Sequence, residues 1–226
     1  SHIRRCTGTG CKTSYEIFNT YRVGYFQNIL NIAPESFSTN EEGELYAATV
    51  ENGTNRAIYA TTAGPYSIGT PNLLLNTPTN DPRYLTVGRF NNDNLSDIIY
   101  WDSKGNNPTL LIQDATGQLN QSSTLIPSTI AAKCTSEASC KFTITAGDID
   151  GNGLSDIINA TEGTIRIHYN TNGIISTNEN IIDTIKYNNI TSISVSSSRD
   201  NSKRNRDIIF SETVNSSSKI CIMSSS

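Results

Sequence analysis

Three aspartates and one asparagine lie an even number of residues apart within a stretch of nine residues, and together they could bind a hard cation. Asp148, Asp150, Asn152 and Asp156 put side-chain oxygens at loop positions one, three, five and nine. Ca²⁺ prefers several oxygen ligands from a flexible loop, backbone carbonyls included, and Leu154 offers its carbonyl at position seven. The pattern therefore predicts that these five residues bind Ca²⁺, and it indicates no catalytic residue.

The glycines and the charges of this stretch favour a bound ion. Gly151 and Gly153 let the chain curl around a cation, and three carboxylates this close would repel one another without one. An EF-hand is not predicted, because the twelfth position is Asn159 instead of glutamate and the flanking segments are β-branched. The alternative is an acidic, Gly-rich hairpin that holds no ion.

The segments on either side of the loop are predicted to be strands. Residues 141–145 alternate in hydrophobicity before the loop, and residues 156–160 follow it. Residues 164–169 alternate as a third strand, on which His168 is expected to be exposed, opposite the isoleucines. Asn172-Gly173 is a hairpin signal before a fourth strand.

The same order of elements recurs along the chain. Residues 87–99 match residues 146–158, with Gly, Leu-Ser-Asp and Ile-Ile at the same offsets, and fainter copies lie at 198–209 and 46–59. A spacing of roughly 40 to 60 residues is that of propeller blades. The predicted clear units cover about 84–120 and 141–183, and the weak units about 44–76 and 191–223.

This loop-and-strand unit resembles the FG-GAP or VCBS repeat, the blade of integrin-α-like calcium-binding β-propellers. The resemblance implies structural calcium at the loop from Asp148 to Asp156 and a binding function rather than catalysis. We expect an all-β fold: a β-propeller, or part of one, with four to five four-stranded antiparallel blades in a single domain over 1–226. The segment 15–26 is expected to supply the missing fourth strand of the last unit. The rival interpretation is that the chain is part of a larger propeller.

The other units depart from the metal-binding pattern. Arg89 stands where the first aspartate belongs, although Asp93 and Asp97 are present, so this loop is expected to replace the ion by a guanidinium paired with both carboxylates. The third copy carries Arg199, Asn201 and Lys203 and is not expected to bind metal.

Composition narrows the class of partner. A net charge of −4 and a pI near 5.2 give no overall attraction to nucleic acid, and no apolar run approaches the ~18 residues of a membrane span. No nucleophile motif or phosphate loop is present. The interpretation is a secreted or cell-surface, lectin-like binding module for a protein or a glycan, and not an enzyme. The alternatives are a carbohydrate-active enzyme on a propeller scaffold and a structural subunit of a larger toxin or surface assembly.

Several other residues carry two interpretations each. Trp101 either stacks on a sugar ring or, as favoured here, packs between blades. The basic segment 199–206 is either a patch for an acidic partner or, as favoured, a solvated hairpin tip. The close cysteine pairs Cys6–Cys11 and Cys134–Cys140 are expected to be disulfides, with Cys221 buried or free, and the alternative is five reduced thiols.

Overall fold

The computed structural model of this chain consists of antiparallel β-sheets, with no α-helix among the residues that it describes. None of these residues forms an apolar helix long enough to span a lipid bilayer. The described residues are 4–6, 15–17, 28–34, 44–52, 55–64, 67–68, 72–76, 82–122, 126–127, 130–132, 134, 136, 140–161, 163–178, 180–181, 187, 189–195, 207–214 and 217–223.

Two four-stranded sheets form the middle of the molecule. One has the order β11-β10-β9-β8 and the other the order β12-β13-β14-β17, so strands that follow one another in each sheet are hydrogen-bonded neighbours. Short turns suffice for such antiparallel connections. Their strands are β8 (Pro82–Gly88), β9 (Asp97–Asp102), β10 (Thr109–Gln113), β11 (Leu119–Gln121), β12 (Phe142–Gly147), β13 (Asp156–Thr161), β14 (Thr164–His168) and β17 (Asn180–Ile181).

Further sheets lie on either side of this pair. A five-stranded sheet precedes it, in the order β3-β4-β5-β6 with β7 also paired to β5, and a sheet of three described strands, β18-β19-β20, follows it. The strands are β3 (Asn28–Pro34), β4 (Glu44–Asn52), β5 (Asn55–Gly64), β6 (Ser67–Ile68), β7 (Asn72–Asn76), β18 (Ile190–Val195), β19 (Ile208–Val214) and β20 (Ser217–Met223). A separate ribbon pairs β1 (Arg4–Cys6) with β2 (Tyr15–Ile17).

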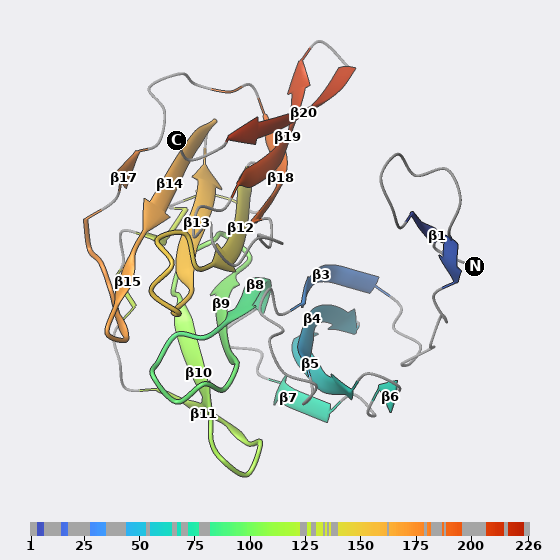
Figure 1. Ribbon diagram of the computed structural model, residues 1–226, viewed down its shortest axis with the longest axis vertical. Coiled ribbons are helices and arrows are strands. Elements are labelled where there is room, and N and C mark those ends of the chain that lie inside the picture. The colour runs from blue at the N-terminus through green and yellow to red at the C-terminus, as the bar shows by residue number, and fades with distance from the viewer. Residues whose placement is uncertain are drawn as a thin grey trace.

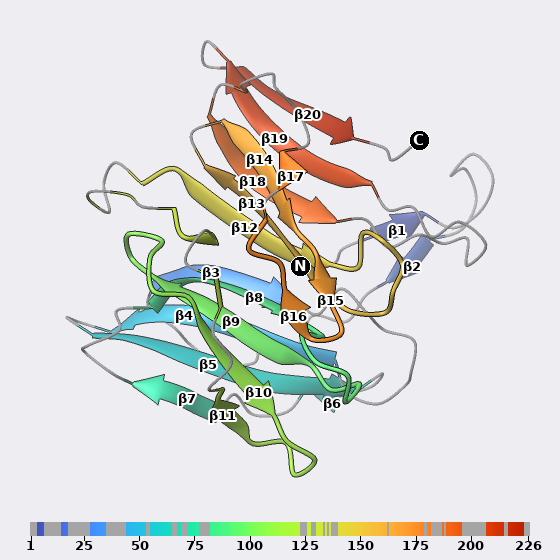
Figure 2. The same cartoon turned by 90° about the vertical axis from the view of Figure 1, so that its left-hand side faces the viewer.

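The four larger sheets pack against one another in chain order, with a hydrophobic cluster between each successive pair. Figure 2 shows β18–β20 at the top, β12–β14 below them, and the two earlier sheets together in the lower part of the view. Their first strands are neighbours: β3 lies beside β8, β8 beside β12 and β12 beside β18. Figure 1 shows the sheets following one another along an arc, with β1 standing apart from them. The loop from Asp148 to Asp156, which joins β12 to β13, therefore begins at a strand that other sheets flank.

Three hydrophobic clusters fill the spaces between the sheets. Ile58 of β5 packs with β8, β9 and β10 in the first cluster. The second lies between the two central sheets, and the third between the sheet of β12–β14 and the last sheet. Clusters therefore cover both faces of β9 and of β13, which explains why the first five residues of each of these strands are all buried. Full burial of an aliphatic or aromatic side chain contributes about 1.5–3 kcal/mol, so these clusters are a main source of stability.

Trp101 packs between two sheets, as predicted from its place on a strand. It is fully buried in the central cluster, and its ring centroid lies 5.9 Å from that of Phe142, on the first strand of the next sheet. Phe142 also meets Tyr84 of β8 edge to face at 5.1 Å. This side chain is therefore part of the core that joins the sheets, not an exposed platform for a sugar.

The turn at Asn172-Gly173 forms as predicted, but it does not lead into the fourth strand of the sheet. Both residues have positive φ, 54° and 81°, as a two-residue type I′ hairpin turn requires. The turn joins β15 (Asn170–Thr171) to β16 (Ile174–Ile175) in a ribbon of its own, and β17 supplies the fourth strand. The prediction was wrong because local turn chemistry specifies a hairpin without specifying which sheet receives it.

His168 was predicted to be an exposed strand residue, and this prediction was wrong, because its side chain is fully buried. Alternation along β14 does place it on the face opposite Ile165 and Ile167. The chain then folds back after β14, and the His168 Nδ1 atom lies 3.4 Å from the carbonyl oxygen of Ser176. The segment after the β15–β16 ribbon thus covers a position that a simple strand pattern leaves in solvent.

The N-terminal segment was predicted to complete the last sheet, yet its described part, Tyr15–Ile17, pairs with β1 instead. The Cys134–Cys140 disulfide is confirmed, with a Cα–Cα distance of 5.2 Å, and Cys221 is a free, partly exposed thiol. Cys11 and the basic segment 199–206 lie outside the described residues, so the Cys6–Cys11 pairing and the interpretation of that segment stay predictions.

A glycine at the end of β8 allows the two central sheets to approach closely. A Cβ built on Gly88 would lie 2.7 Å from the Ser155 Cβ, and one on Gly147 would lie 2.9 Å from the Val195 Cβ of the sheet that follows. Carbon atoms of side chains do not approach this closely, so any larger residue at either position would push two sheets apart.

We therefore predict that Gly88→Ala lowers the free energy of unfolding by about 1–3 kcal/mol, the usual cost of overpacking a well-packed contact. Ser155→Gly removes the atoms that the new methyl group meets, so the double variant should be more stable than the sum of the single effects predicts. Chemical denaturation of the four proteins measures this coupling. Strict additivity would show that the contact between Gly88 and Ser155 does not limit the approach of the sheets.

Candidate metal-binding loop

The loop between β12 and β13 is closed by the ladder of these two strands. Gly147, the last residue of β12, pairs with Asp156, the first residue of β13, so the loop begins and ends at one point of the sheet. Gly151 and Gly153 have φ values of 76° and 91°, a region that side chains disfavour. These two glycines let the chain reverse within a few residues, as the sequence predicted.

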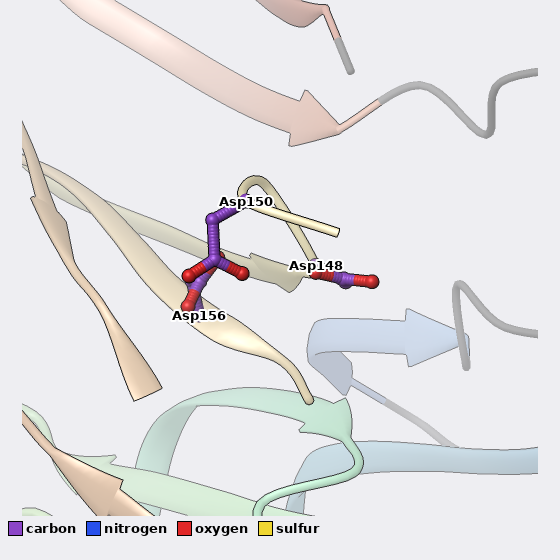
Figure 3. Close-up of side chains that lie close together, drawn as sticks. All are labelled: Asp148, Asp150 and Asp156. Carbon is purple, nitrogen blue, oxygen red and sulfur yellow. The ribbon is translucent and has the colours of Figure 1, made fainter. Parts of the chain in front are cut away.

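Three carboxylates converge within this loop. One oxygen each of Asp148, Asp150 and Asp156 lies within 4.8 Å of the others, and Figure 3 shows the three side chains on the loop and at the start of β13. Asp148 and Asp156 are buried, whereas Asp150 is exposed. Among the residues that the structure describes, no other group of three acidic, histidine or cysteine side chains comes this close together.

Backbone amides hold Asp148 in place. Its Oδ1 accepts hydrogen bonds from the N–H groups of Gly151, at 2.7 Å, and Asn152, at 3.0 Å, and its Oδ2 accepts one from Gly153 at 3.1 Å. The Asn152 N–H also lies 3.1 Å from the Asp150 Oδ1. The turn is therefore organised around the two carboxylates at its first and third positions.

Asp156 connects the loop to a more distant part of the sheet. Its Oδ2 accepts a hydrogen bond from the N–H of Ile149 at 2.7 Å, and its Oδ1 accepts one from the N–H of Asn170 at 2.8 Å. Burial raises the pKa of this carboxyl to about 7, and the nearby charges of Asp150 and Asp148 add to the rise, although the hydrogen bonds act in the opposite direction. A cation beside it would favour the ionised form.

Asn152 and Leu154 complete the loop. The Asn152 Oδ1 accepts a hydrogen bond from the Leu154 N–H at 2.8 Å, and its Nδ2 donates to the Asp150 Oδ2 at 3.1 Å and to the Asn170 carbonyl at 2.8 Å. The Leu154 side chain is buried. The structure thus brings Asn152 beside the carboxylates, and the role of the Leu154 carbonyl as a ligand stays a prediction.

The chemistry of the loop fits a hard divalent cation. Its donor atoms are carboxylate and amide oxygens, the ligands that Ca²⁺ takes in proteins. Two of the three carboxylates are withdrawn from water, and buried charges require hydrogen bonds, a partner or a metal ion. Backbone amides supply part of this compensation, and a cation among the three carboxylates would supply the rest.

The loop of the preceding sheet, residues 89–96, shares one part of this design. Asp97 is fully buried at the start of β9, and it accepts hydrogen bonds from the N–H groups of Phe90 and Gln113, both at 3.0 Å. Asp156 receives the corresponding pair from Ile149 and Asn170. The last aspartate of each loop is therefore a structural link, whether or not the loop carries three carboxylates.

The remaining residues of that loop make local contacts. The Asn91 Nδ2 donates to the Asp93 Oδ2 at 2.8 Å, and the Asp93 Oδ1 accepts from the Leu95 N–H at 2.8 Å. Asp93 is exposed. The expected pairing of Arg89 with Asp93 and Asp97 stays a prediction.

Sequence reasoning did not identify two residues that support the acidic loop. Ser155 and Asn170 are both fully buried and connect the acidic loop to the preceding sheet. Ser155 stands inside the repeated Leu-Ser-Asp, and its recurrence was a signal for it. Asn170 carries no such signal, because one more asparagine in an asparagine-rich chain does not reveal that its side chain is buried.

Comparison with known protein families identifies the class of this region. Residues 89–158 match the model of the FG-GAP-like repeat, and this stretch runs from the Arg89 loop through the acidic loop into β13. These residues thus carry an FG-GAP-like repeat, as the resemblance indicated. No curated protein matches the chain.

The buried carboxyl of Asp97 gives a pH-dependent prediction. Its folded-state pKa is raised to about 7, chiefly by burial, from an ordinary value of 3.8. The folded protein therefore retains a proton that the unfolded chain releases between about pH 4 and 7, so the contribution of Asp97 to stability falls across this range as pH rises. The total effect is at most about 4 kcal/mol.

Asp97→Asn stays neutral at every pH but leaves one of the two backbone N–H groups without an acceptor, at a cost of about 1–3 kcal/mol. The variant should be less stable than the wild type at pH 5, and this deficit should shrink as the pH rises to 8. Urea unfolding of both proteins across this range measures the difference. A deficit that does not change with pH would contradict the raised pKa.

Proposed function

We propose that this protein is a calcium-stabilised binding module, built from FG-GAP repeats as a β-propeller or part of one, which recognises a protein or a glycan outside the cell or at its surface. The observation that carries the calcium assignment is the convergence of Asp148, Asp150 and Asp156 within 4.8 Å, inside the stretch that matches the FG-GAP-like repeat. Asn152 and Leu154 complete the proposed set of ligands.

The stacking of the sheets supports the propeller. The neighbouring first strands β3, β8, β12 and β18 and the burial between successive sheets are what adjacent blades require. We take the units 44–76, 84–120, 141–183 and 191–223 as blades of a single domain over 1–226, with four to five blades. Ile220 and Ile222 are exposed on β20, so the apolar stacking has room to continue on this side.

The class of the repeat and the chemistry of the chain favour binding over catalysis. FG-GAP repeats are typical of binding and adhesion modules, and the buried aspartates of the two loops have structural tasks, since each accepts two backbone hydrogen bonds. The Cys134–Cys140 disulfide is compatible with an oxidising compartment. The proposed site of action is therefore extracytoplasmic, as a secreted or cell-surface protein.

Removal of calcium should destabilise the protein. If ambient calcium exceeds the dissociation constant by roughly tenfold to a hundredfold, binding contributes about 1.4 to 2.7 kcal/mol, so a chelator should lower the melting temperature by several degrees. Asp150→Asn removes an exposed ligand charge without introducing a cavity and should abolish most of this response. Differential scanning fluorimetry with and without added Ca²⁺ measures both effects.

The matched control for this experiment is Asp93→Asn, because Asp93 is also an exposed carboxylate, and it lies in the loop headed by Arg89. This variant should keep the full calcium response. The stabilising role would be refuted by calcium-loaded wild-type protein whose melting a chelator does not change. A full response in Asp150→Asn would place the ion elsewhere.

The binding function predicts that calcium-loaded protein retains glycans or proteins without altering them. A glycan array, combined with analysis of the bound sugars for cleavage, separates this function from that of a carbohydrate-active enzyme. Retention of intact ligands, weakened by the chelator, is the expected result. Release of shortened sugars would instead establish catalysis on the propeller scaffold.

A further inference from the structure

Asn170 stands where the acidic loop, the preceding sheet and the β15–β16 ribbon meet. It is fully buried and lies just after β14. Its backbone serves the acidic loop, because its N–H donates to the Asp156 Oδ1 at 2.8 Å and its carbonyl accepts from the Asn152 Nδ2 at 2.8 Å. The main chain of Asn170 is thus part of the structure that supports the carboxylates.

The side chain of Asn170 faces a different partner. Its Nδ2 donates to the carbonyl of Phe90 at 3.1 Å and to the carbonyl of Ser155 at 3.2 Å. Phe90 belongs to the Arg89 loop of the preceding sheet and is 80 positions away in the chain. One residue therefore contacts both loops: its backbone bonds to the acidic loop, and its amide bridges Ser155 of that loop and Phe90 of the other.

Ser155 makes a second connection between the same two loops. The Arg89 N–H donates to the Ser155 Oγ at 2.9 Å, and the Ser155 N–H donates to the Arg89 carbonyl at 2.8 Å. Ser155 directly precedes Asp156, so a change in the acidic loop reaches this pair of hydrogen bonds without an intermediate residue. Both connections end on adjacent residues of one loop, Arg89 and Phe90.

We propose that Asn170 is a positioning residue that couples the acidic loop to the preceding sheet, so that a cation bound among Asp148, Asp150 and Asp156 also stabilises the contact between the two sheets. This inference rests on the calcium site proposed above. It adds that the effect of the ion extends beyond its own loop, to residues 88–97 of the neighbouring sheet.

The cation site and the contact between Asn170 and Phe90 are coupled because both order the same residue, Asn170. An ion that orders the acidic loop fixes Asp156 and Asn152, and these two residues hold the backbone of Asn170. With its backbone held, the Asn170 amide loses less conformational freedom when it donates to Phe90. Coupling of this kind between sites commonly amounts to a factor of five or more in an equilibrium.

Hydrogen–deuterium exchange of the full chain, with Ca²⁺ alone as the ligand, tests the coupling. In the wild type, Ca²⁺ should slow exchange in the peptide over 148–157 and also, by about fivefold or more, in the peptide over 88–97. Asn170→Ala keeps the two backbone bonds to Asp156 and Asn152 and removes the amide that bridges Ser155 and Phe90. Calcium protection should therefore persist at 148–157 and largely disappear at 88–97.

The matched control is Asn159→Ala. Asn159 is also buried, in the same sheet, but its Nδ2 donates to the carbonyl of Ile130, outside both loops. Asn159→Ala also removes a buried amide, but it should retain calcium protection in both peptides. If Asn170 had only a structural role, Asn170→Ala and Asn159→Ala would affect calcium protection at 88–97 alike. Ser155→Ala is the second test of the connection should Asn170→Ala fail to fold, and it should weaken calcium protection at 88–97.

The possible failures are distinguishable by calorimetric titration with Ca²⁺. An absence of calcium binding overturns the proposed site and the coupling with it. Binding with protection confined to 148–157 in the wild type overturns the coupling alone. Unchanged protection at 88–97 in Asn170→Ala overturns the role of this residue.

Discussion

A carboxylate that is taken out of water needs hydrogen-bond donors or a cation, and this requirement organises the centre of the molecule. Asp97 and Asp156 are both fully buried at the first residue of a second strand, and each accepts two backbone N–H groups. In each case one donor lies in the loop before the aspartate, and the other lies at the end of the third strand, as Gln113 does, or just after it, as Asn170 does. Each aspartate therefore ties its loop to the end of the neighbouring third strand, and the loop must present its backbone amide to the buried carboxylate oxygen.

Burial on both faces of the central sheets is the second consequence of this arrangement. The loops approach the neighbouring sheet closely enough for Ser155 to exchange two hydrogen bonds with Arg89, and Gly88 makes room for this approach. Apolar side chains of alternating positions then fill the spaces on either side, as Ile99 and Trp101 do on one face of β9 and Ile98 and Tyr100 on the other. Polar links at the loops and apolar clusters along the strands thus hold the same interfaces.

The acidic loop differs from the loop before it in the number of carboxylates that it brings together. Both end in a buried aspartate that accepts two backbone N–H groups, but of the two only the loop from Asp148 to Asp156 brings three carboxylates together. An ion at that loop would compensate the carboxylate charges, which hydrogen bonds from backbone amides stabilise only in part. The last aspartate holds the sheet in both loops, and under the proposed function the earlier positions decide whether the loop binds a cation. In the proposed function, binding depends on a scaffold that we propose the ion stabilises.

The amino-acid sequence by itself determined the kind of element and the chemistry of the loop. Alternation and turn residues identify β8 to β10 and β12 to β14, and the spacing of Asp148, Asp150 and Asp156 identifies the oxygen cluster, because both depend on residues close together in the chain. The tertiary structure decided what depends on distant segments: that His168 is covered, that the turn at Asn172-Gly173 forms a ribbon of its own, and that Asn170 reaches Phe90. An isolated asparagine or histidine has no local pattern that reveals its burial, since burial is set by packing between sheets, and the packed residues can lie far apart in the chain, as Phe90 and Asn170 do at a separation of 80 positions.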